Sequence, residues 1–330
     1  MNYVIGIDGG GTKTAAVILD QQGNVCGVGE GGPSTYGVVP LEVTRRSIFV
    51  AASVAARHAN VPSVGFTAAF LGLGNVVSAV DRAAVRNIAV DLGLAAARRT
   101  GVDHDIRIAL AGGLTGRSGI VLIAGTGTSC FGLNSAGQTW RAGGWGPLID
   151  DEGSSYWLGI QAMRAAVLDY DGRGQSTRLT EAVRQKLALQ EMDDLMNRLY
   201  AAEMTRTEIA ALAPLVFEVA AQDDALALDL IRRGCAAMAD CALAVARRLG
   251  LDQSPSELTL VGGLTKAGPA LHAPFAEALH VRLPLCVLCP PELPPALGAA
   301  LLALQVAGQA LDEPLLSAVR QTARQHKLID

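Results

Sequence analysis

A strand–turn–strand unit that occurs twice limits the possible folds of this chain more than any other feature of its sequence. The copies span residues 3–23 and 119–137. In each copy an apolar run leads into a glycine–threonine turn, and a second β-rich run then ends at a turn glycine. The equivalent positions are Thr12 and Thr126 in the first turn, and Gly23 and Gly137 in the second. Agreement in order, turn chemistry and spacing indicates an internal duplication.

The remaining periodicity predicts an α/β protein. A third β-rich run follows the first copy, so we expect three antiparallel strands joined by short turns. Strands are expected at residues 3–8, 14–20, 24–30, 66–73, 102–105, 119–124, 130–134, 257–261 and 285–288. Apolar residues at helical spacing predict helices at 41–60, 79–100, 106–114, 154–169, 269–279, 294–307 and 313–326, and further helical stretches within 177–249.

The length of the chain and the duplication together predict the domains. A chain of 330 residues usually forms about two domains. The boundary should fall between the copies, which gives a first domain at 1–116. The second domain is then expected at 117–311, enlarged by a helical insertion. We expect the last helix, about 312–330, to pack back on the first domain.

Charge and hydropathy exclude several classes of partner. A net charge of -4 without clusters of Lys and Arg does not suit a nucleic-acid-binding protein. The longest uncharged stretches, 59–80 and 118–140, are interrupted by Gly, Asn and Ser, so no membrane span is expected. The N-terminus lacks the pattern of a signal peptide, and six scattered cysteines suit reduced thiols. We therefore expect a cytoplasmic protein that acts on a small molecule.

The two glycine turns are candidates for phosphate binding. Backbone amides of Gly10, Gly11, Thr12 and Lys13 in the first turn, and of Gly125, Thr126 and Gly127 in the second, could surround phosphates. The first turn is not a Walker loop, because Lys13 does not directly follow a glycine, nor a dinucleotide fingerprint, because a strand follows it. A plain hairpin turn is the alternative for either loop. Their paired occurrence favours an ATP polyphosphate held from both sides.

Asp8 ends the first strand, directly before the first glycine turn. Mg²⁺ in proteins usually keeps several waters and one or two carboxylates, so Asp8 is placed to hold it through water. A strand-end carboxylate that only caps the turn is the alternative.

Three further stretches carry a resemblance to a known family. They are the run from Gly143 to Ser154, the loop from Asp171 to Gly174, and the segment from Leu260 to Leu264. With the paired turns, they resemble the N-acetylglucosamine kinase branch of the BadF/BadG-type ATPases, within the sugar kinase, hsp70 and actin superfamily. The resemblance covers nearly the whole chain.

The resemblance implies a fold and an activity. The fold would be a duplicated two-domain actin-like ATPase (ribonuclease H-like) fold with an interdomain cleft. The activity would be transfer of a phosphoryl group from ATP, with Mg²⁺, to an amino sugar, most simply N-acetylglucosamine to its 6-phosphate. A homodimer is compatible with it. Glucosamine or another hexose is the alternative substrate, and a regulatory ATPase acting on a protein partner is the alternative class.

The resemblance also implies roles for individual residues. Thr12 and Thr126 would lie against the ATP phosphates, and Gly262 and Gly263 would begin the adenosine-side pocket. Asp151 would bind sugar hydroxyls, although a carboxylate there could also be a helix N-cap. The other substrate-binding candidates are Thr35, Thr128, Ser129, Gly144, Trp145 and Gly146. Trp145 alone would more often be a core residue.

Phosphoryl transfer to a hydroxyl needs a base. The family places an Asp before an Ala-rich helix, and alignment on Ala109–Gly112 selects Asp105. Asp103 is the nearby alternative, and Asp105 could instead be a helix N-cap.

Two departures from the family pattern affect the sugar site. Thr35 and Ser129 stand where relatives carry Asn. An amide donates and accepts in one plane, whereas a hydroxyl reaches less far. Recognition of an acetamido group is therefore expected to be modest.

Overall fold

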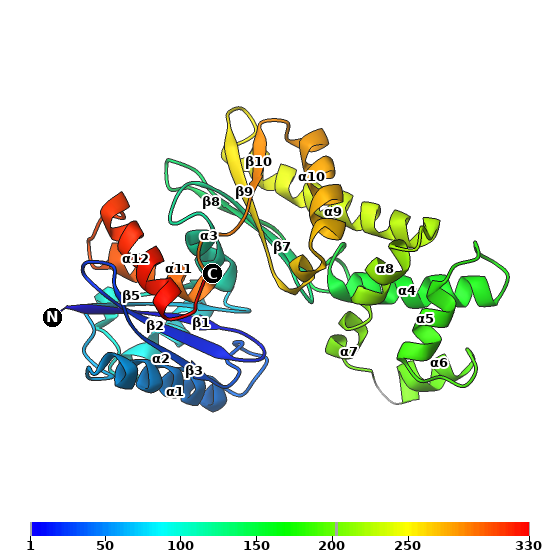
Figure 1. The fold of residues 1–330 in the computed structure, drawn as a ribbon. Helices are drawn as coiled ribbons and strands as arrows, with labels where there is room; N and C mark the ends of the chain where they lie inside the picture. The colour runs from blue at the N-terminus through cyan, green and yellow to red at the C-terminus, as the bar shows by residue number, and fades with distance from the viewer. Residues whose placement is uncertain (1, 202–203, 330) are drawn as a thin grey trace. The chain divides into compact units, whose positions relative to one another are not determined.

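The chain forms two compact units in the computed structural model, which describes residues 2–201 and 204–329. Unit 1 comprises Met1–Ser118 together with Pro290–Asp330, and unit 2 comprises Gly119–Cys289. Each unit contains one five-stranded sheet covered by helices, and the colours of Figure 1 show that unit 1 combines both ends of the chain.

The sheet of unit 1 begins with three antiparallel strands, as the repeat predicted. Its strands are β1 (Tyr3–Gly9), β2 (Thr14–Asp20), β3 (Val25–Gly31), β4 (Ala68–Leu73) and β5 (Thr100–His104). The order is β3-β2-β1-β4-β5. β1, β2 and β3 pair antiparallel, whereas β4 and β5 join in parallel, so the carboxyl ends of β1, β4 and β5 lie at one edge of the sheet.

Helices cover both faces of this sheet. They are α1 (Leu41–Ala59), α2 (Ala79–Asp91), the short η1 (Ala97–Arg99), α3 (Asp105–Gly113), α11 (Pro295–Val306) and α12 (Glu313–Gln325). Because successive side chains of a strand point to opposite faces, Ile5 and Ile7 pack with α1, and Val4 with α11 and α12. Figure 1 shows α11 and α12 beside the strands of the N-terminal segment.

Helix α11 belongs to unit 1, whereas the sequence placed residues 290–311 in the second domain. Its contact with α3 is close enough to exclude any side chain at Gly298. A Cβ there would lie 2.0 Å from the Ile108 carbonyl oxygen and 2.4 Å from the Gly112 nitrogen. The backbone N–H of Leu293, just before the helix, also donates to Gly112 O at 3.2 Å. Residues 312–329 lie in unit 1, where α12 packs on the same face as α11.

Unit 2 repeats the strand arrangement of unit 1. Its strands are β6 (Gly119–Ala124), β7 (Thr128–Leu133), β8 (Thr139–Gly143), β9 (Ser256–Val261) and β10 (Cys286–Cys289). The order is β10-β9-β6-β7-β8, in which β6, β7 and β8 correspond to β1, β2 and β3. The pairing is again antiparallel within these three and parallel beyond them. The duplication predicted from the sequence is therefore a duplication of topology.

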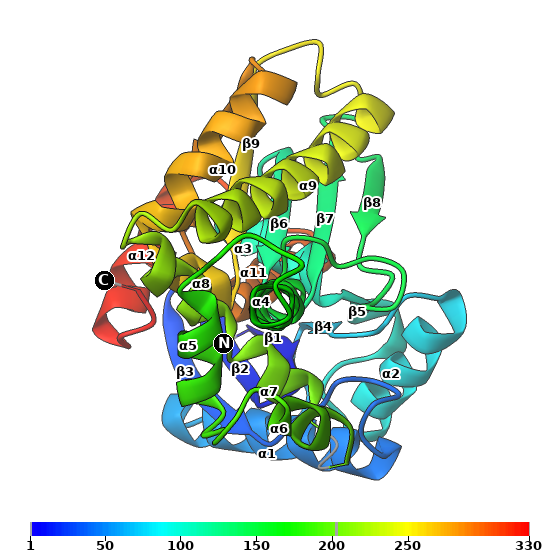
Figure 2. The same ribbon diagram turned by 90° about the vertical axis from the view of Figure 1, so that its right-hand side faces the viewer.

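The helices of unit 2 form a large insertion between β8 and β9, followed by two that lie between β9 and β10. They are α4 (Ser155–Tyr170), α5 (Leu179–Lys186), α6 (Asp194–Met196), the π-helical turn η2 (Asn197–Ala201), α7 (Arg206–Ala210), α8 (Ala213–Ala220), α9 (Ala225–Leu249), η3 (Gly263–Ala267) and α10 (Pro269–Arg282). Figure 2 shows α9 and α10 across the strands β6, β7 and β9. No helix of the described residues has both the length and the hydropathy of a membrane span.

One predicted helix is shorter in the structure. The sequence suggested a helix over 79–100, but α2 ends at Asp91. Gly93 has a φ of +69°, a left-handed conformation that commonly terminates helices. The chain can then return to β5 at Thr100.

The contact of Gly298 gives a stability prediction. Gly298→Ala should force α11 away from α3, because the new methyl group would overlap backbone atoms that cannot move independently. Overpacking of this kind usually destabilises by about 1–3 kcal/mol. We expect the melting temperature of the chain, measured by circular dichroism, to fall by several degrees.

Ser317→Ala is the control, since Ser317 lies on the exposed side of α12 in the same unit. It should change stability by less than about 0.5 kcal/mol. An equal melting temperature for Gly298→Ala and Ser317→Ala would show that the α3–α11 contact is not as tight as described.

Candidate active site

The first glycine turn (residues 9–13) connects β1 to β2 and is fastened to a neighbouring loop. The turn closes through Gly10 N–H, which donates to Lys13 O at 3.0 Å. Ser34 N–H donates to Gly10 O at 3.0 Å, and Thr14 Oγ1 lies 2.7 Å from the buried Ser34 Oγ. Gly11, Thr12 and Lys13 are exposed, so their backbone amides are accessible to a ligand.

Thr35 and Asp105 border the same short stretch of backbone after β4. Gly74 N–H donates to Gly9 O at 2.9 Å, which fixes this stretch against the glycine turn. A Cβ placed on Gly74 would lie 3.4 Å from Asp105 Oδ2 and 3.5 Å from Thr35 Oγ1. Thr35 Oγ1 would also lie 3.6 Å from a Cβ on Gly11. The structure thus brings together the predicted base, a predicted sugar contact and the first glycine turn.

The two candidate bases have different surroundings. Asp103 accepts from Arg82 Nε at 3.1 Å and Nη2 at 2.9 Å, so its carboxylate is already paired. Asp105 Oδ1 is buried and accepts no hydrogen bond among the described residues, although the His104 ring nitrogen Nδ1 lies beside it. The helix cap is His104, and Asp105 is the first residue of α3. Asp103 Oδ1 is thus held by Arg82, whereas Asp105 Oδ2 lies near Gly74 and Thr35.

Asp8 lies close enough to Asp105 for their charges to interact. Burial and the negative charge of Asp105 raise the pKa of Asp8 from 3.8 to about 7, and Lys13 acts in the opposite direction. Two neighbouring carboxylates without a bound cation repel each other, and a divalent cation would relieve that repulsion. Among the described residues no three His, Cys, Asp or Glu side chains are grouped as a metal site. The donor set therefore suits a Mg²⁺ ion that keeps most of its waters.

The second glycine turn (residues 125–128) connects β6 to β7 in unit 2. Gly125 N–H donates to Gly127 O at 3.0 Å, which closes this turn over three residues where the first turn spans four. The first residues of α4 lie on it, because Ser155 N–H donates to Gly125 O at 2.8 Å. Thr126 itself is exposed.

A cavity of about 740 Å³ opens beside this turn. Its lining residues are Gly125, Thr126, Ser155, Thr207, Ala210, Ala211, Ala213, Pro214, Phe217, Glu218, Gly263, Leu264, Lys266 and Ala267. The walls are mainly apolar, and its volume suits a small organic ligand. The structure thus brings Gly263 of the predicted adenosine-side segment to the second glycine turn. Gly262 adjoins it at the end of β9, where a Cβ would meet Ala124 O at 2.4 Å.

Asp151 is held at the second glycine turn by Thr128 and Arg206. Only 2% of the residue is exposed, and Oδ1 accepts from Thr128 N–H at 3.2 Å. Oδ2 lies 2.5 Å from Arg206 Nη2. Burial raises the pKa of Asp151, while the Thr128 amide and the Arg206 charge lower it. The N-cap of α4 is Ser154, so Asp151 does not serve as its cap.

Two buried hydroxyls lie at the start of β7, where the Thr128 N–H donates to Asp151. Thr128 Oγ1 and Ser129 Oγ are buried and make no hydrogen bond among the described residues. A Cβ on Gly144 would lie 2.9 Å from Ser129 Oγ, so the segment after β8 crosses directly over Ser129. Unpaired buried hydroxyls are unfavourable unless a ligand or water satisfies them.

Trp145 is a surface residue, with 69% of its area exposed. Its backbone N–H donates to Asp150 Oδ2 at 3.0 Å, which closes the loop that contains Gly146. The Arg141 guanidinium lies 5.3 Å from the ring centroid. The core alternative for Trp145 is therefore wrong, and its ring is available to a ligand.

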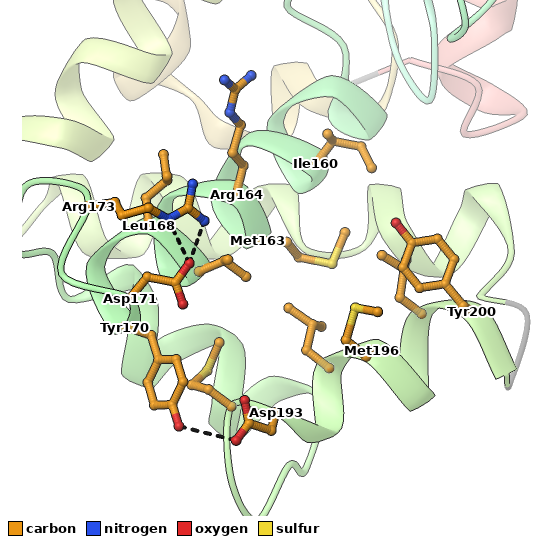
Figure 3. Close-up of a pocket in the computed structure, with 14 residues that line it drawn as sticks. Ile160, Met163, Arg164, Leu168, Tyr170, Asp171, Arg173, Asp193, Met196 and Tyr200 are labelled. Carbon is orange, nitrogen blue, oxygen red and sulfur yellow. Dashed lines mark hydrogen bonds and ion pairs between the residues drawn. The ribbon is translucent and has the colours of Figure 1, made fainter.

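A second cavity of unit 2, of about 550 Å³, lies within the helical insertion (Figure 3). Methionine, tyrosine and leucine side chains of α4, α6 and η2 line it. It contains none of the predicted site residues.

Sequence reasoning missed Arg206, Ser34 and Gly74. The residues Thr205 to Glu208 form a capping box, which predicts the start of a helix but not the contact of Arg206 with Asp151. Ser34 lies beside Thr35 in sequence, yet its buried bond to Thr14 depends on the tertiary fold. Gly74 had no distinguishing pattern.

Known proteins that resemble this chain are named as amino-sugar kinases. The chain is 30% identical over 303 residues to the N-acetylmuramic acid/N-acetylglucosamine kinase of Clostridium acetobutylicum, with 92% of this chain and 98% of the relative covered. It is 30% identical to the N-acetyl-D-glucosamine kinase of Dictyostelium discoideum, with 91% and 97% covered. A solved structure of a candidate N-acetylglucosamine kinase from Chromobacterium violaceum matches with a TM-score of 0.71 and 29% identity, and covers 92% of this chain and 99% of that one.

The two duplicated α/β units have the actin-like ATPase fold that the sequence resemblance implied. The model of the BadF/BadG/BcrA/BcrD ATPase family matches residues 5–303, nearly the whole chain. The chain therefore belongs to the BadF/BadG/BcrA/BcrD ATPase family.

Proposed function

We propose that this chain is an ATP-dependent amino-sugar kinase that converts N-acetylglucosamine to its 6-phosphate. The observation that carries the proposal is the place of the Asp105 carboxylate: a Cβ on Gly74, whose N–H is bonded to Gly9 O at the first glycine turn, would lie 3.4 Å from Asp105 Oδ2. A substrate hydroxyl is a suitable donor for such an oxygen. The kinase names of the relatives support the same activity.

In the proposed reaction Asp105 accepts the proton of the sugar hydroxyl. The hydroxyl oxygen forms a bond to the γ-phosphorus of ATP, and the bond from that phosphorus to the bridging oxygen breaks. The products are the sugar phosphate and ADP, and the proton passes from Asp105 to water. Asp103 is the alternative base, and its Oδ1 is already paired with Arg82.

Asp8 would hold Mg²⁺ through water. A bound Mg²⁺ neutralises charge on the phosphates during transfer. Amides of the two glycine turns would bind the phosphates, and the cavity beside Gly263 would take the adenosine.

The sugar-binding groups of unit 2 lie around Asp151. Its carboxylate would accept from ring hydroxyls, with Ser129 and Thr128 as the nearby unpaired hydroxyls. Trp145 would supply an apolar surface from the adjoining loop. From unit 1, Thr35 would add one more hydroxyl beside Asp105.

Glucosamine or another hexose is the alternative substrate, since Thr35 and Ser129 replace amides. A regulatory ATPase that acts on a protein partner is the alternative from another class. The buried Asp151 and the unpaired hydroxyls next to it favour a small polyhydroxyl ligand. ATP hydrolysis that no sugar stimulates would favour the regulator.

The role of Asp105 is tested by Asp105→Asn. This change preserves the size of the side chain but removes its ability to accept a proton, so turnover should fall about 10²–10⁴-fold. Binding of ATP, measured by calorimetry, should stay near the wild-type value.

Asp103→Asn is the comparison, because it alters the neighbouring carboxylate that is paired with Arg82. It should retain most of the turnover. If Asp103→Asn is inactive while Asp105→Asn is active, the base is Asp103.

The role of Asp8 is tested by Asp8→Asn with Mg²⁺ varied at saturating ATP. Loss of a carboxylate that orients metal-bound water typically weakens metal affinity about 10–100-fold. We expect the Mg²⁺ concentration at half-maximal rate to rise by a factor in that range. An unchanged Mg²⁺ dependence would show that Asp8 only caps the turn.

Specificity follows from the hydroxyls at positions 35 and 129. A site that merely accommodates a group discriminates about 10–200-fold, whereas one built to hydrogen-bond it discriminates about 10⁴-fold or more. We expect kcat/KM for N-acetylglucosamine to exceed that for glucosamine by about 10–200-fold. Asp151→Ala should weaken every accepted sugar. A preference above the higher figure would mean that other residues read the acetamido group.

A further inference from the structure

Arg206 links two parts of the proposed site within unit 2. It is the first residue of α7, and its Nη2 lies 2.5 Å from Asp151 Oδ2. The carboxylate side chain is only 3% exposed, whereas the arginine side chain is 45% exposed. The guanidinium therefore has one edge on the buried carboxylate and another edge open to ligands.

The same guanidinium lies against the second glycine turn. A Cβ placed on Gly127 would be 2.8 Å from Arg206 Nη2 and 2.9 Å from Asp151 Oδ2. A phosphate bound by the amides of this turn would thus come close to the arginine. Any side chain at position 127 would separate the turn from both charged groups.

Helix α7 also lines the nucleotide cavity. Thr207, Ala210 and Ala211 follow Arg206 in the helix or directly after it, and all three contribute to the cavity wall. The guanidinium lies 5.8 Å from the ring centroid of Tyr156, whose backbone N–H donates to Thr126 O at 3.3 Å. Arg206 is therefore supported by the same segment that holds the glycine turn.

A guanidinium has five N–H donors in a planar fork that matches carboxylates and phosphates equally. One of these donors is used on Asp151 Oδ2, an oxygen that sugar hydroxyls would also need. A phosphate at the turn offers the fork a second anion. When N–H groups of Arg206 donate to the phosphate, Asp151 Oδ2 becomes free to accept hydrogen bonds from the sugar.

We propose that Arg206 couples the two substrates, so that a nucleotide bound at the second glycine turn strengthens sugar binding at Asp151. Arg206 is then a positioning residue for Asp151. This inference rests on the proposed function, because it needs both a phosphate at residues 125–128 and a sugar at Asp151. Coupling of this kind is reciprocal, so the sugar strengthens nucleotide binding by the same factor.

The experiment compares wild type, Arg206→Met and Arg206→Lys by calorimetry. The affinity for N-acetylglucosamine is measured with and without a saturating non-hydrolysable ATP analogue. In the wild type we expect the analogue to tighten sugar binding about 10-fold, within the usual range for coupled sites. In Arg206→Met the ratio of the sugar affinities with and without the analogue should fall to near one. Arg206→Lys keeps the charge without the fork and should give an intermediate ratio.

Arg233→Met is the matched control. Arg233 is another half-exposed arginine of unit 2, stacked on Trp157 at 5.7 Å and paired with Asp229. It should keep the wild-type ratio. Melting curves of all variants identify any that fail to fold. If Arg206→Met does not fold, the ratio measured for Arg206→Lys tests the coupling instead.

An unchanged ratio of the two sugar affinities in Arg206→Met would overturn the inference, because the arginine then does not couple the substrates. If both affinities fall by the same factor, Arg206 only supports Asp151. A wild-type chain that binds the analogue but no sugar would instead refute the proposed function, and the inference with it, before any variant is compared.

Discussion

Each unit holds carboxylates beside a loop suited to phosphates, and this crowding of negative charge is the constraint on which the site depends. Burial, together with the negative charge of Asp105, raises the pKa of Asp8 to about 7. Asp151 is almost completely buried, which raises its pKa as well. Anions in such positions need compensation, because burial without a partner strongly disfavours the charged form.

The two units compensate in different ways. Unit 2 carries its own cation, Arg206, and adds the Thr128 amide. In unit 1 the charge of Lys13 lowers the pKa of Asp8 only partly, and the lysine side chain is exposed and paired with Glu30. Under the proposed function unit 1 therefore obtains its cation from solution, as Mg²⁺ with ATP. The two units therefore share a topology but differ in how their buried carboxylates are neutralised.

The sequence predicted most of the strands and the duplication, because alternating apolar runs and glycine turns are local signals. It did not assign α11 to unit 1, since an apolar helix has the same sequence pattern whichever sheet it covers. It left Asp103 and Asp105 as alternatives, because the pairing of Asp103 with Arg82 exists only in the fold. Arg206 was missed for the same reason, as 55 positions separate it from Asp151.

The assembly of unit 1 from both ends of the chain affects how the protein can fold as it is synthesised. All of unit 2 is contiguous and can be complete when residue 289 has emerged. The strands of unit 1 precede unit 2 in the sequence, but α11 and α12, which cover Val4, Val17 and Leu19, follow it. Domains usually fold in the order in which they are made, and exposed apolar surface promotes aggregation meanwhile. Here the sheet of unit 1 must wait with one apolar face uncovered until α11 and α12 have been made, so the second unit can be complete before the first.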